Sequence, residues 1–570
     1  MCHVRETARA AFVAVNFFVL ALPGLLGSTA IAFAIGTLVL ILLNIAILTT
    51  WRRDPDVTTS DSASGTVRNT APRTAVAAAA GLVALVLVFV AARSWLHQIL
   101  IFPIDAQRAD MLVVIEHGIR RVLEGQNPYA TYHVPWEATL PYGPVLWMPY
   151  LTPYVIHADI RFAAIASALF IPTVCAVCAT ALAFDRRIAA AAGCVLMLCA
   201  IVFSPDLRGF ISIAHTPSYW PLIAVYAWCV ARERWLMAAL FGGVLIVART
   251  TMVAVAPVLL LAVWHRERRL MGKTTALLAA SAVLPFVPFA LADFRALEHA
   301  LYGSYQHLMK EFVWTQTTWA HNSVGVTGLL LRAGWKSLVE PTQVVSMLAV
   351  YVAAFIRLRR GDRPLPWMAI ALLVFSMTTL WPVHYIYLDV FLLLVCGVVA
   401  EYIFSRRWHR FAVSVPLCAT VLAIAIAVDI PTSPIVDVRR SNRAFLYAGF
   451  SADERGDGSF AWVDGNRAEV LLPRRSRVDA RIEIVCEPNL AEASAVQDMS
   501  VSLNDTVLGT GTLRGGLQAV TLAAPGRVWQ YGVNRLGLSF PTGGSPADSD
   551  ERRDSRKLSV ACARVAVRTP

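Results

Sequence analysis

The sequence predicts a membrane all-α part of about thirteen transmembrane helices followed by a C-terminal all-β domain, and three observations support this fold class. Of the 570 residues, 57% are hydrophobic and only 15% are charged, whereas about a quarter are charged in an average soluble protein. The apolar residues form runs of bilayer-crossing length, such as "TAIAFAIGTLVLILLNIAIL". Beyond about residue 440, short alternating segments replace these runs.

Residues 1–74 contain two predicted transmembrane helices and a polar cytoplasmic linker. The first apolar run lacks a small-residue cleavage site, and a second run follows almost at once. We therefore expect the first run to be a retained helix and not a signal peptide.

Short loops that are rich in arginine separate the apolar runs. By the positive-inside rule, these loops and the N-terminus lie in the cytoplasm. The net charge of +12 therefore reflects orientation in a lipid bilayer, and no nucleic-acid partner is expected. The clustered arginines are Arg52 and Arg53, Arg186 and Arg187, Arg266 to Arg269, Arg357 to Arg363, and Arg406 to Arg410.

Residues 75–430 form the predicted transmembrane core, with long outer loops at 100–160 and 293–338. Irregular polar and aromatic sequence gathers in these two loops, so we expect the chemistry on the outer face. The stretch 144–157 is apolar enough to enter the membrane, and we interpret it as re-entrant or interfacial; a crossing there would reverse the topology after it. The predicted spans are 75–99, 162–183, 188–204, 218–231, 236–248, 251–264, 274–292, 339–357, 366–381, 386–404 and 411–429.

Residues 440–570 are predicted to form an extracytoplasmic antiparallel β-sandwich or jelly roll. Asn504 and Asp505 mark the turn of a hairpin within "LNDTVLG". Cys486 and Cys562 lie in strand-like runs, so we expect them either to form a disulfide or to be buried on neighbouring strands.

The first outer loop contains two aspartates followed by an amphipathic helical pattern. Asp105 and Asp110 lie just beyond the span at 75–99. A carboxylate before an interfacial helix suits an enzyme with a lipid donor, because the carboxylate can deprotonate an acceptor hydroxyl. The alternative is that Asp110 caps the helix, a role in which Asp is favourable.

Three polar residues lie at predicted outer ends of apolar spans. Arg249 suits a phosphate group, and its alternative is snorkelling to the interface. His384 can donate to a phosphate or hold a proton, or it can bond a neighbouring helix. His215, in "SIAHTPSYW", is expected to line the same cavity.

The second outer loop holds a polar and aromatic run that includes His321 and Asn322. Aromatic faces with hydrogen-bonding groups at their edges suit a sugar acceptor. The alternative is an aromatic belt at the membrane interface.

Several short motifs together resemble polytopic glycosyltransferases of the C-type superfamily, especially glycosyltransferase family 87. They are Asp110 followed by "GQNPY", "YGP" from Tyr142, "WAHNSVGVTGLLLR" with His321 and Asn322, and "WPVHY" with His384. The resemblance covers roughly 75–410. Two departures are the second aspartate and the two additional N-terminal helices.

The resemblance implies an inverting enzyme with an outward-facing site and a polyprenyl-phosphate sugar donor. Asp110 would be the general base, with Asp105 as the second candidate, and His384 would lie in the donor site. The acceptor would be a lipid-linked or cell-envelope glycan, reached from the cytoplasmic membrane. The C-terminal domain looks like the jelly rolls of carbohydrate-binding modules.

No cofactor is predicted. The outer loops contain no carboxylate pair such as DxD, so the sequence leaves the requirement for a divalent metal open. Two other functions remain open. A transporter or flippase of a lipid-linked glycan would show internal repeats and broken helices in both halves, and no repeat is evident. A non-catalytic scaffold that displays a glycan-binding domain would need far fewer helices.

Overall fold

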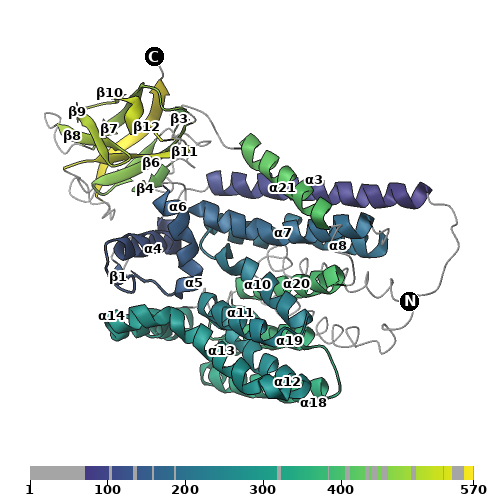
Figure 1. Ribbon diagram of the computed structural model, residues 1–570. Helices are drawn as coiled ribbons and strands as arrows, with labels where there is room; N and C mark the ends of the chain where they lie inside the picture. Colours follow the sequence, from purple (N-terminus) through teal and green to yellow (C-terminus); the bar gives the residue numbers. More distant parts are fainter. Residues whose placement is uncertain are drawn as a thin grey trace.

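In the computed structural model, a helical part is followed by a C-terminal β domain (Figure 1). The two predicted N-terminal spans lie outside the described residues. Those residues are 71–101, 106–132, 138–156, 160–184, 188–316, 323–382, 384–404, 411–429, 435–437, 446–450, 460–474, 476–489, 496–530, 532–541 and 557–568.

The first half of the helical part contains a long helix, an amphipathic helix, a small hairpin and a series of apolar helices. In chain order these are α3 (Ala71–Ile101), α4 (Ala106–Leu123), β1 (Thr131–Tyr132), β2 (Ala138–Thr139), α5 (Pro144–Trp147), η1 (Met148–Tyr150), α6 (Leu151–Val155), α7 (Arg161–Phe184), α8 (Ile188–Phe203), α9 (Pro205–Ile213), η2 (Pro217–Tyr219), α10 (Trp220–Ala231) and α11 (Trp235–Ala248).

All the secondary-structure elements in the described residues of the second half are helices. It consists of η3 (Thr250–Val255), α12 (Ala256–Arg266), η4 (Arg268–Leu270), α13 (Met271–Val283), η5 (Leu284–Phe286), α14 (Val287–Glu298), η6 (His299–Gly303), α15 (Ser304–His307), η7 (Leu308–Val313), α17 (Gly325–Arg332), η8 (Lys336–Leu338), α18 (Val339–Arg359), α19 (Pro364–Thr378), η9 (His384–Tyr387), α20 (Leu388–Phe404) and α21 (Phe411–Asp429).

Four helical segments of the described chain are long and apolar enough to cross a membrane. Six further apolar helices have only 10–17 residues. The predicted number of about thirteen spans is therefore not confirmed, although helical structure lies over every span predicted between 75 and 429. The four long segments are Ala78–Leu96, Arg161–Phe184, Arg268–Glu311 and Lys336–Arg359.

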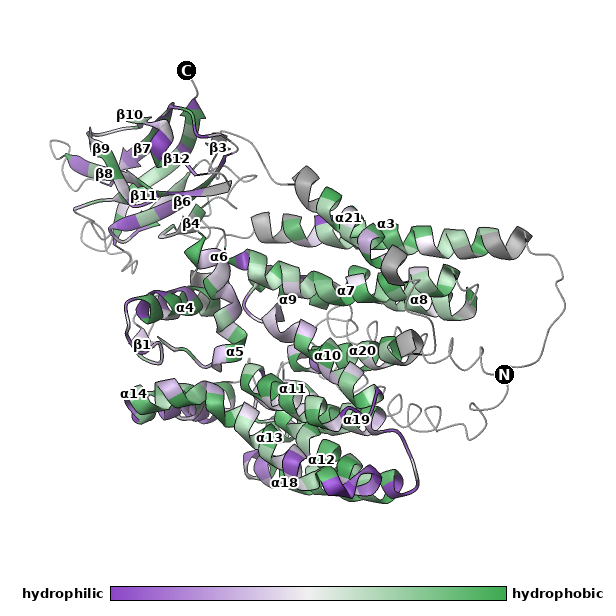
Figure 2. Cartoon of the chain, in the orientation of Figure 1, coloured by the Kyte–Doolittle hydropathy of each residue, from purple (hydrophilic) through white to green (hydrophobic). Residues whose placement is uncertain are grey.

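The helices pack side by side around one continuous apolar core (Figure 1). α3 packs against α7, α8 and α21, while α10 packs against α20 and α11 against α13. Large side chains such as Trp95, Trp220 and Tyr226 are fully buried between them. Figure 2 shows hydrophobic residues over most of the helices, and hydrophilic residues around β1 and in the loop that joins α18 to α19.

The predicted outer loop 293–338 is largely helical, which corrects the expectation of irregular structure there. The backbone leaves the helical conformation at Asp293 (φ −162°, ψ 98°). The Asp293 carboxylate then accepts a hydrogen bond from the Ala296 N–H at 3.0 Å. The predicted span therefore ends where expected, and a second helix begins because Asp293 caps it.

The stretch 144–157 forms short consecutive helical turns, α5, η1 and α6, over residues 144–155. The stretch is thus three short pieces and not one continuous helix, which is the form expected of a re-entrant or interfacial segment.

The loops that the arginine pattern predicts to share one side of the membrane do meet at one end of the helices. Arg266 donates from Nη1 to Glu233 Oε1 at 2.6 Å. Its Nη2 donates to the carbonyls of Gly361 and Asp362 at 3.4 and 3.2 Å.

Predicted outer segments meet at the other end. The hydroxyl groups of Thr139 and Ser304 are 2.9 Å apart, and the Val324 N–H donates to the Pro382 carbonyl at 2.9 Å. The grouping of loops at two ends is thus observed in the described residues.

The β domain consists of two five-stranded antiparallel sheets that enclose a second apolar core. One sheet has the order β10-β7-β12-β3, with β5 also paired to β12, and the other has the order β4-β6-β11-β8-β9. The strands are β3 (Ile435–Asp437), β4 (Leu446–Ala448), β5 (Ala461–Asp464), β6 (Arg467–Arg474), β7 (Ala480–Pro488), β8 (Gln497–Leu503), β9 (Thr506–Leu513), β10 (Gln518–Ala524), β11 (Gly532–Ser539) and β12 (Leu558–Arg568).

Two predictions for this domain are confirmed. Leu503 pairs with Thr506 across a two-residue turn in which Asn504 and Asp505 both have positive φ, as a type I′ hairpin requires. Cys486 and Cys562 face each other across β7 and β12, buried and with free thiols. The second of the two alternatives for these cysteines, burial on neighbouring strands, is therefore the observed one.

Candidate functional site

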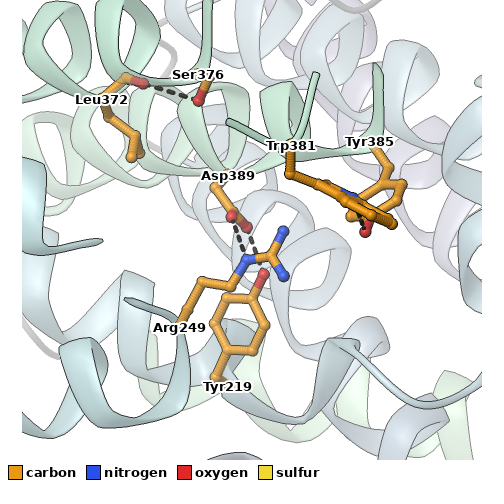
Figure 3. A network of polar contacts seen from close by, with 7 residues as sticks. All are labelled: Tyr219, Arg249, Leu372, Ser376, Trp381, Tyr385 and Asp389. Atoms are coloured by element: carbon orange, nitrogen blue, oxygen red, sulfur yellow. Dashed lines mark hydrogen bonds and ion pairs between the residues drawn. The ribbon is translucent and has the colours of Figure 1, made fainter. Parts of the chain in front are cut away.

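A buried carboxylate organises the end of the helical bundle at which the predicted outer segments meet. Asp389 lies in the first turn of α20 and is only 1% exposed. It accepts a hydrogen bond from the Tyr219 hydroxyl on Oδ1 and one from Arg249 Nε on Oδ2 at 3.0 Å (Figure 3). Three elements far apart in the chain are thus joined at one charged centre.

Arg249 occupies a break between two apolar helices. α11 ends at Ala248, Arg249 is extended (φ −143°, ψ 102°), and η3 starts at Thr250. Its side chain is 13% exposed, and the Asp389 carboxylate balances its charge. A charge in this environment is costly unless paired, and the default interpretation of such a residue is functional.

The guanidinium of Arg249 uses only one of its three nitrogens for this pairing. Its two terminal amino groups make no hydrogen bond within the described part of the chain, and in Figure 3 only Nε is joined to Asp389. The guanidinium carbon lies 5.7 Å from the centre of the Tyr385 ring. Four N–H donors therefore remain for an anionic ligand, for which a guanidinium fork is well suited.

Aromatic side chains line the same region. Trp381 Nε1 donates to the Tyr385 hydroxyl at 2.6 Å. Phe210 stacks on Tyr385 with ring centres 5.3 Å apart, and its ring is nearly parallel to that of Trp220. Flat aromatic faces beside a cationic group suit a ligand that carries both a sugar and an anion.

His215 lies in the connection between α9 and α10, beside this aromatic group. The preceding residue, Ala214, adopts a left-handed conformation (φ 60°), and its carbonyl accepts a hydrogen bond from Tyr150 at 2.8 Å. Burial, and next the charge of Arg249, lower the pKa of His215 to about 3. The ring is therefore neutral near pH 7, and its buried Nδ1 has no hydrogen-bond partner among the described residues.

The "YGP" motif joins the first outer segment to this centre. The Tyr142 ring lies 5.8 Å from the His215 ring. A Cβ on Gly143 would come within 2.0 Å of the Val247 carbonyl oxygen, so only glycine permits this approach to the end of α11. Pro144 begins α5, a position that suits its fixed φ.

Three of the predicted site residues, Tyr142, His215 and Arg249, thus come together. His384 is the first residue of η9, next to Tyr385, but its side chain lies outside the described residues. Asp105, His321 and Asn322 also lie outside them.

Asp110 is the fifth residue of α4, and its side chain is not among those described. Because α4 begins at Ala106, Asp110 is not the N-cap. The capping alternative for Asp110 is therefore wrong.

The sequence analysis missed two members of the network, Tyr219 and Asp389. Asp389 interrupts the apolar run "YIYLDVFLLLVCGVV", and the argument that singled out Arg249 applies equally to an acid in that position. Tyr219 has no comparable signal, because its importance depends on a partner 170 residues away.

Within the described residues, no group of three or more His, Cys, Asp or Glu side chains has the arrangement of a metal site. No protein-family model matches the chain, and no curated protein matches it.

Proposed function

We propose that this protein is a membrane glycosyltransferase that moves a hexose or pentose from a polyprenyl-phosphate donor to a lipid-linked or cell-envelope glycan. The observation that carries the proposal is Arg249, held by Asp389 through Nε with its other donors unused beside aromatic rings. A phosphate on the donor is the anion that such a fork would bind.

The proposal includes a topology. The shorter apolar helices would also cross the bilayer, giving about thirteen spans with the N-terminus in the cytoplasm. The network and the β domain would then lie on the outer side. Two groups of contacts support this arrangement. Arg266 bonds Glu233 and Gly361 at one end of the helices, and Arg249 bonds Asp389 at the other.

The chemical step follows from an inverting mechanism. The acceptor hydroxyl oxygen attacks the anomeric carbon as the bond from that carbon to the phosphate oxygen breaks. Polyprenyl phosphate leaves with the electron pair, and Arg249 stabilises its charge. The proton of the hydroxyl passes to the Asp110 carboxylate, or to Asp105 if that residue is the base.

Other residues would bind and orient the substrates. His215, neutral near pH 7, would exchange a hydrogen bond with a sugar hydroxyl through its unpartnered Nδ1. Tyr142 would lie beside the sugar, and His384 near the phosphate. His321 and Asn322 would belong to the acceptor side.

The test is transfer from short-chain polyprenyl-phosphate sugars by the full chain in lipid nanodiscs. Asp110→Asn is expected to reduce the rate by about 10²–10⁴-fold. Arg249→Lys is expected to raise the KM for the donor, because lysine cannot reproduce the planar fork. The matched control is Arg266→Lys at the other end of the helices, which should leave the KM unchanged.

Three outcomes would change the proposal. Loss of activity in Asp105→Asn but not in Asp110→Asn would move the base to Asp105. Full activity in both variants would contradict the mechanism. Movement of intact donor across vesicle membranes, without transfer, would favour the flippase alternative.

A further inference from the structure

The β domain contacts the helical part through an ion pair that is largely shielded from water. Arg535 on β11 donates from Nη1 to Glu116 Oε1 on α4 at 3.0 Å. The two side chains are only 18% and 9% exposed. Glu116 and Arg535 are 419 residues apart in the chain, so this contact joins two folding units.

The helical part covers the outward face of the sheet β4-β6-β11-β8-β9 around Arg535. Leu536 and Leu538 point into the core of the β domain, so Arg535 points away from it. Leu471 lies opposite Arg535 in the register of β6 and β11. Leu471 is 4% exposed and packs into the core of the helical part, so an apolar contact accompanies the ion pair.

Further polar groups surround the pair. The Arg535 guanidinium lies 5.1 Å from the centre of the Tyr154 ring on α6. Glu469 on β6 approaches Arg535 to 3.8 Å. Burial, and next the Glu116 carboxylate, raise the pKa of Glu469.

We propose that Arg535 and Glu116 form a latch through which the β domain fixes the position of α4. A buried ion pair contributes little net stability compared with apolar residues, but it allows few alternative arrangements. α4 also carries Asp110. Arg535 is then a positioning residue, and this catalytic consequence rests on the proposed function. The β domain thereby acts on the membrane part directly, in addition to any contact with glycan.

Hydrogen–deuterium exchange of α4 in the full chain tests the latch without reference to activity. Arg535→Glu and Glu116→Arg should each make the α4 amides exchange at least about tenfold faster. Each variant leaves a buried charge without a partner, and the resulting loss of stability is larger than the free-energy change that corresponds to a tenfold faster exchange. The double variant Arg535→Glu/Glu116→Arg restores opposite charges and should bring exchange back toward wild type. Recovery in the double variant shows that the faster exchange comes from the lost charge pairing, and circular dichroism of each single variant checks that it folds.

The matched control is Arg568→Glu. Arg568 pairs with Glu483 at 2.6 Å within the other sheet, so the same charge change occurs away from α4. Exchange of α4 should remain at the wild-type rate in this variant. Unchanged exchange in both Arg535→Glu and Glu116→Arg would overturn the latch.

Transfer assays separate the latch from its catalytic role. Arg535→Glu should lower kcat by about tenfold or more with the donor KM nearly unchanged, and the double variant should recover it. Faster α4 exchange with unaltered kcat would overturn the positioning role. A wild-type chain without transferase activity would refute the proposed function, and the exchange measurements would still decide the latch.

Discussion

At the scale of single residues, the candidate site depends on Asp389 more than on any residue that the sequence singled out. Its carboxylate holds Arg249 and Tyr219 at once, and it is almost inaccessible to solvent. Without Asp389, the guanidinium would have no counter-charge among the described residues. The position of the proposed phosphate-binding group is therefore set by a residue that need not touch the phosphate.

Asp389→Asn is expected to destabilise the protein strongly. The amide keeps the size of the side chain but removes the charge that balances Arg249, and breaking a buried pair costs about 3–5 kcal/mol. Thermal unfolding in detergent measures the effect. Replacing both partners, as in Arg249→Met/Asp389→Leu, should recover much of the loss, because no buried charge then remains.

The control for this prediction is Glu340→Gln. Glu340 pairs with Lys310 at 2.8 Å, but both side chains are about half exposed. An exposed pair contributes at most about 1 kcal/mol. Equal unfolding temperatures for Asp389→Asn and Glu340→Gln would contradict the importance assigned to the buried pair.

At the scale of elements, apolar length alone predicted most helices. The predicted span 75–99 corresponds to α3 (Ala71–Ile101), and 162–183 to α7 (Arg161–Phe184). Local composition failed where a helix is polar: it did not predict that helical structure resumes after Asp293. The failure has a physical cause, since a helix that restarts at a cap lacks the long apolar run on which the prediction relied.

Gly143→Ala should displace the backbone at the end of α11 and not only a side chain. The added Cβ would meet the Val247 carbonyl oxygen at 2.0 Å, so the end of α11 that carries Arg249 must move. We expect a loss of about 1–3 kcal/mol in unfolding free energy, with a raised donor KM. Unfolding in detergent and donor titration measure the two effects.

Gly272→Ala is the matched control for this variant. Gly272 lies in α13, and a Cβ there would meet nothing within 4 Å. Alanine is the better helix former, so this variant should be as stable as wild type or gain up to about 1 kcal/mol. If Gly143→Ala had the same stability and donor KM as Gly272→Ala, the close approach of the "YGP" segment to α11 would not be needed for stability or for donor binding.

At the scale of the whole molecule, the contacts that define the site could not be predicted from the sequence. Tyr219 and Asp389 are 170 residues apart, and Arg249 and Asp389 are 140 apart. Arg249 and Asp389 each interrupt an apolar run, so each can be noticed in the sequence, but nothing in the sequence shows that the two form a pair. The arginine pattern did predict which loops share an end, because orientation in a bilayer alternates from span to span.

The proposed topology predicts which end of the helices faces the cytoplasm. Arg269 and Ser337 are both exposed, and they lie at opposite ends. Arg269 follows Arg266, whose side chain bonds the carbonyl of Gly361 beyond the far end of α18, whereas Ser337 precedes the start of α18. A membrane-impermeant maleimide applied to intact cells should therefore label Ser337→Cys at once, and Arg269→Cys only after permeabilisation.

The parent chain is the control for this labelling, because every native cysteine in the described residues is buried or largely so. The reverse result, with Arg269→Cys labelled in intact cells, would place the Arg249–Asp389 network on the cytoplasmic side. A donor sugar would then have to be bound there, and a transferase of outward orientation would be refuted. Equal labelling of both positions in intact cells would contradict the alternation of spans itself, since one predicted span, 274–292, separates them.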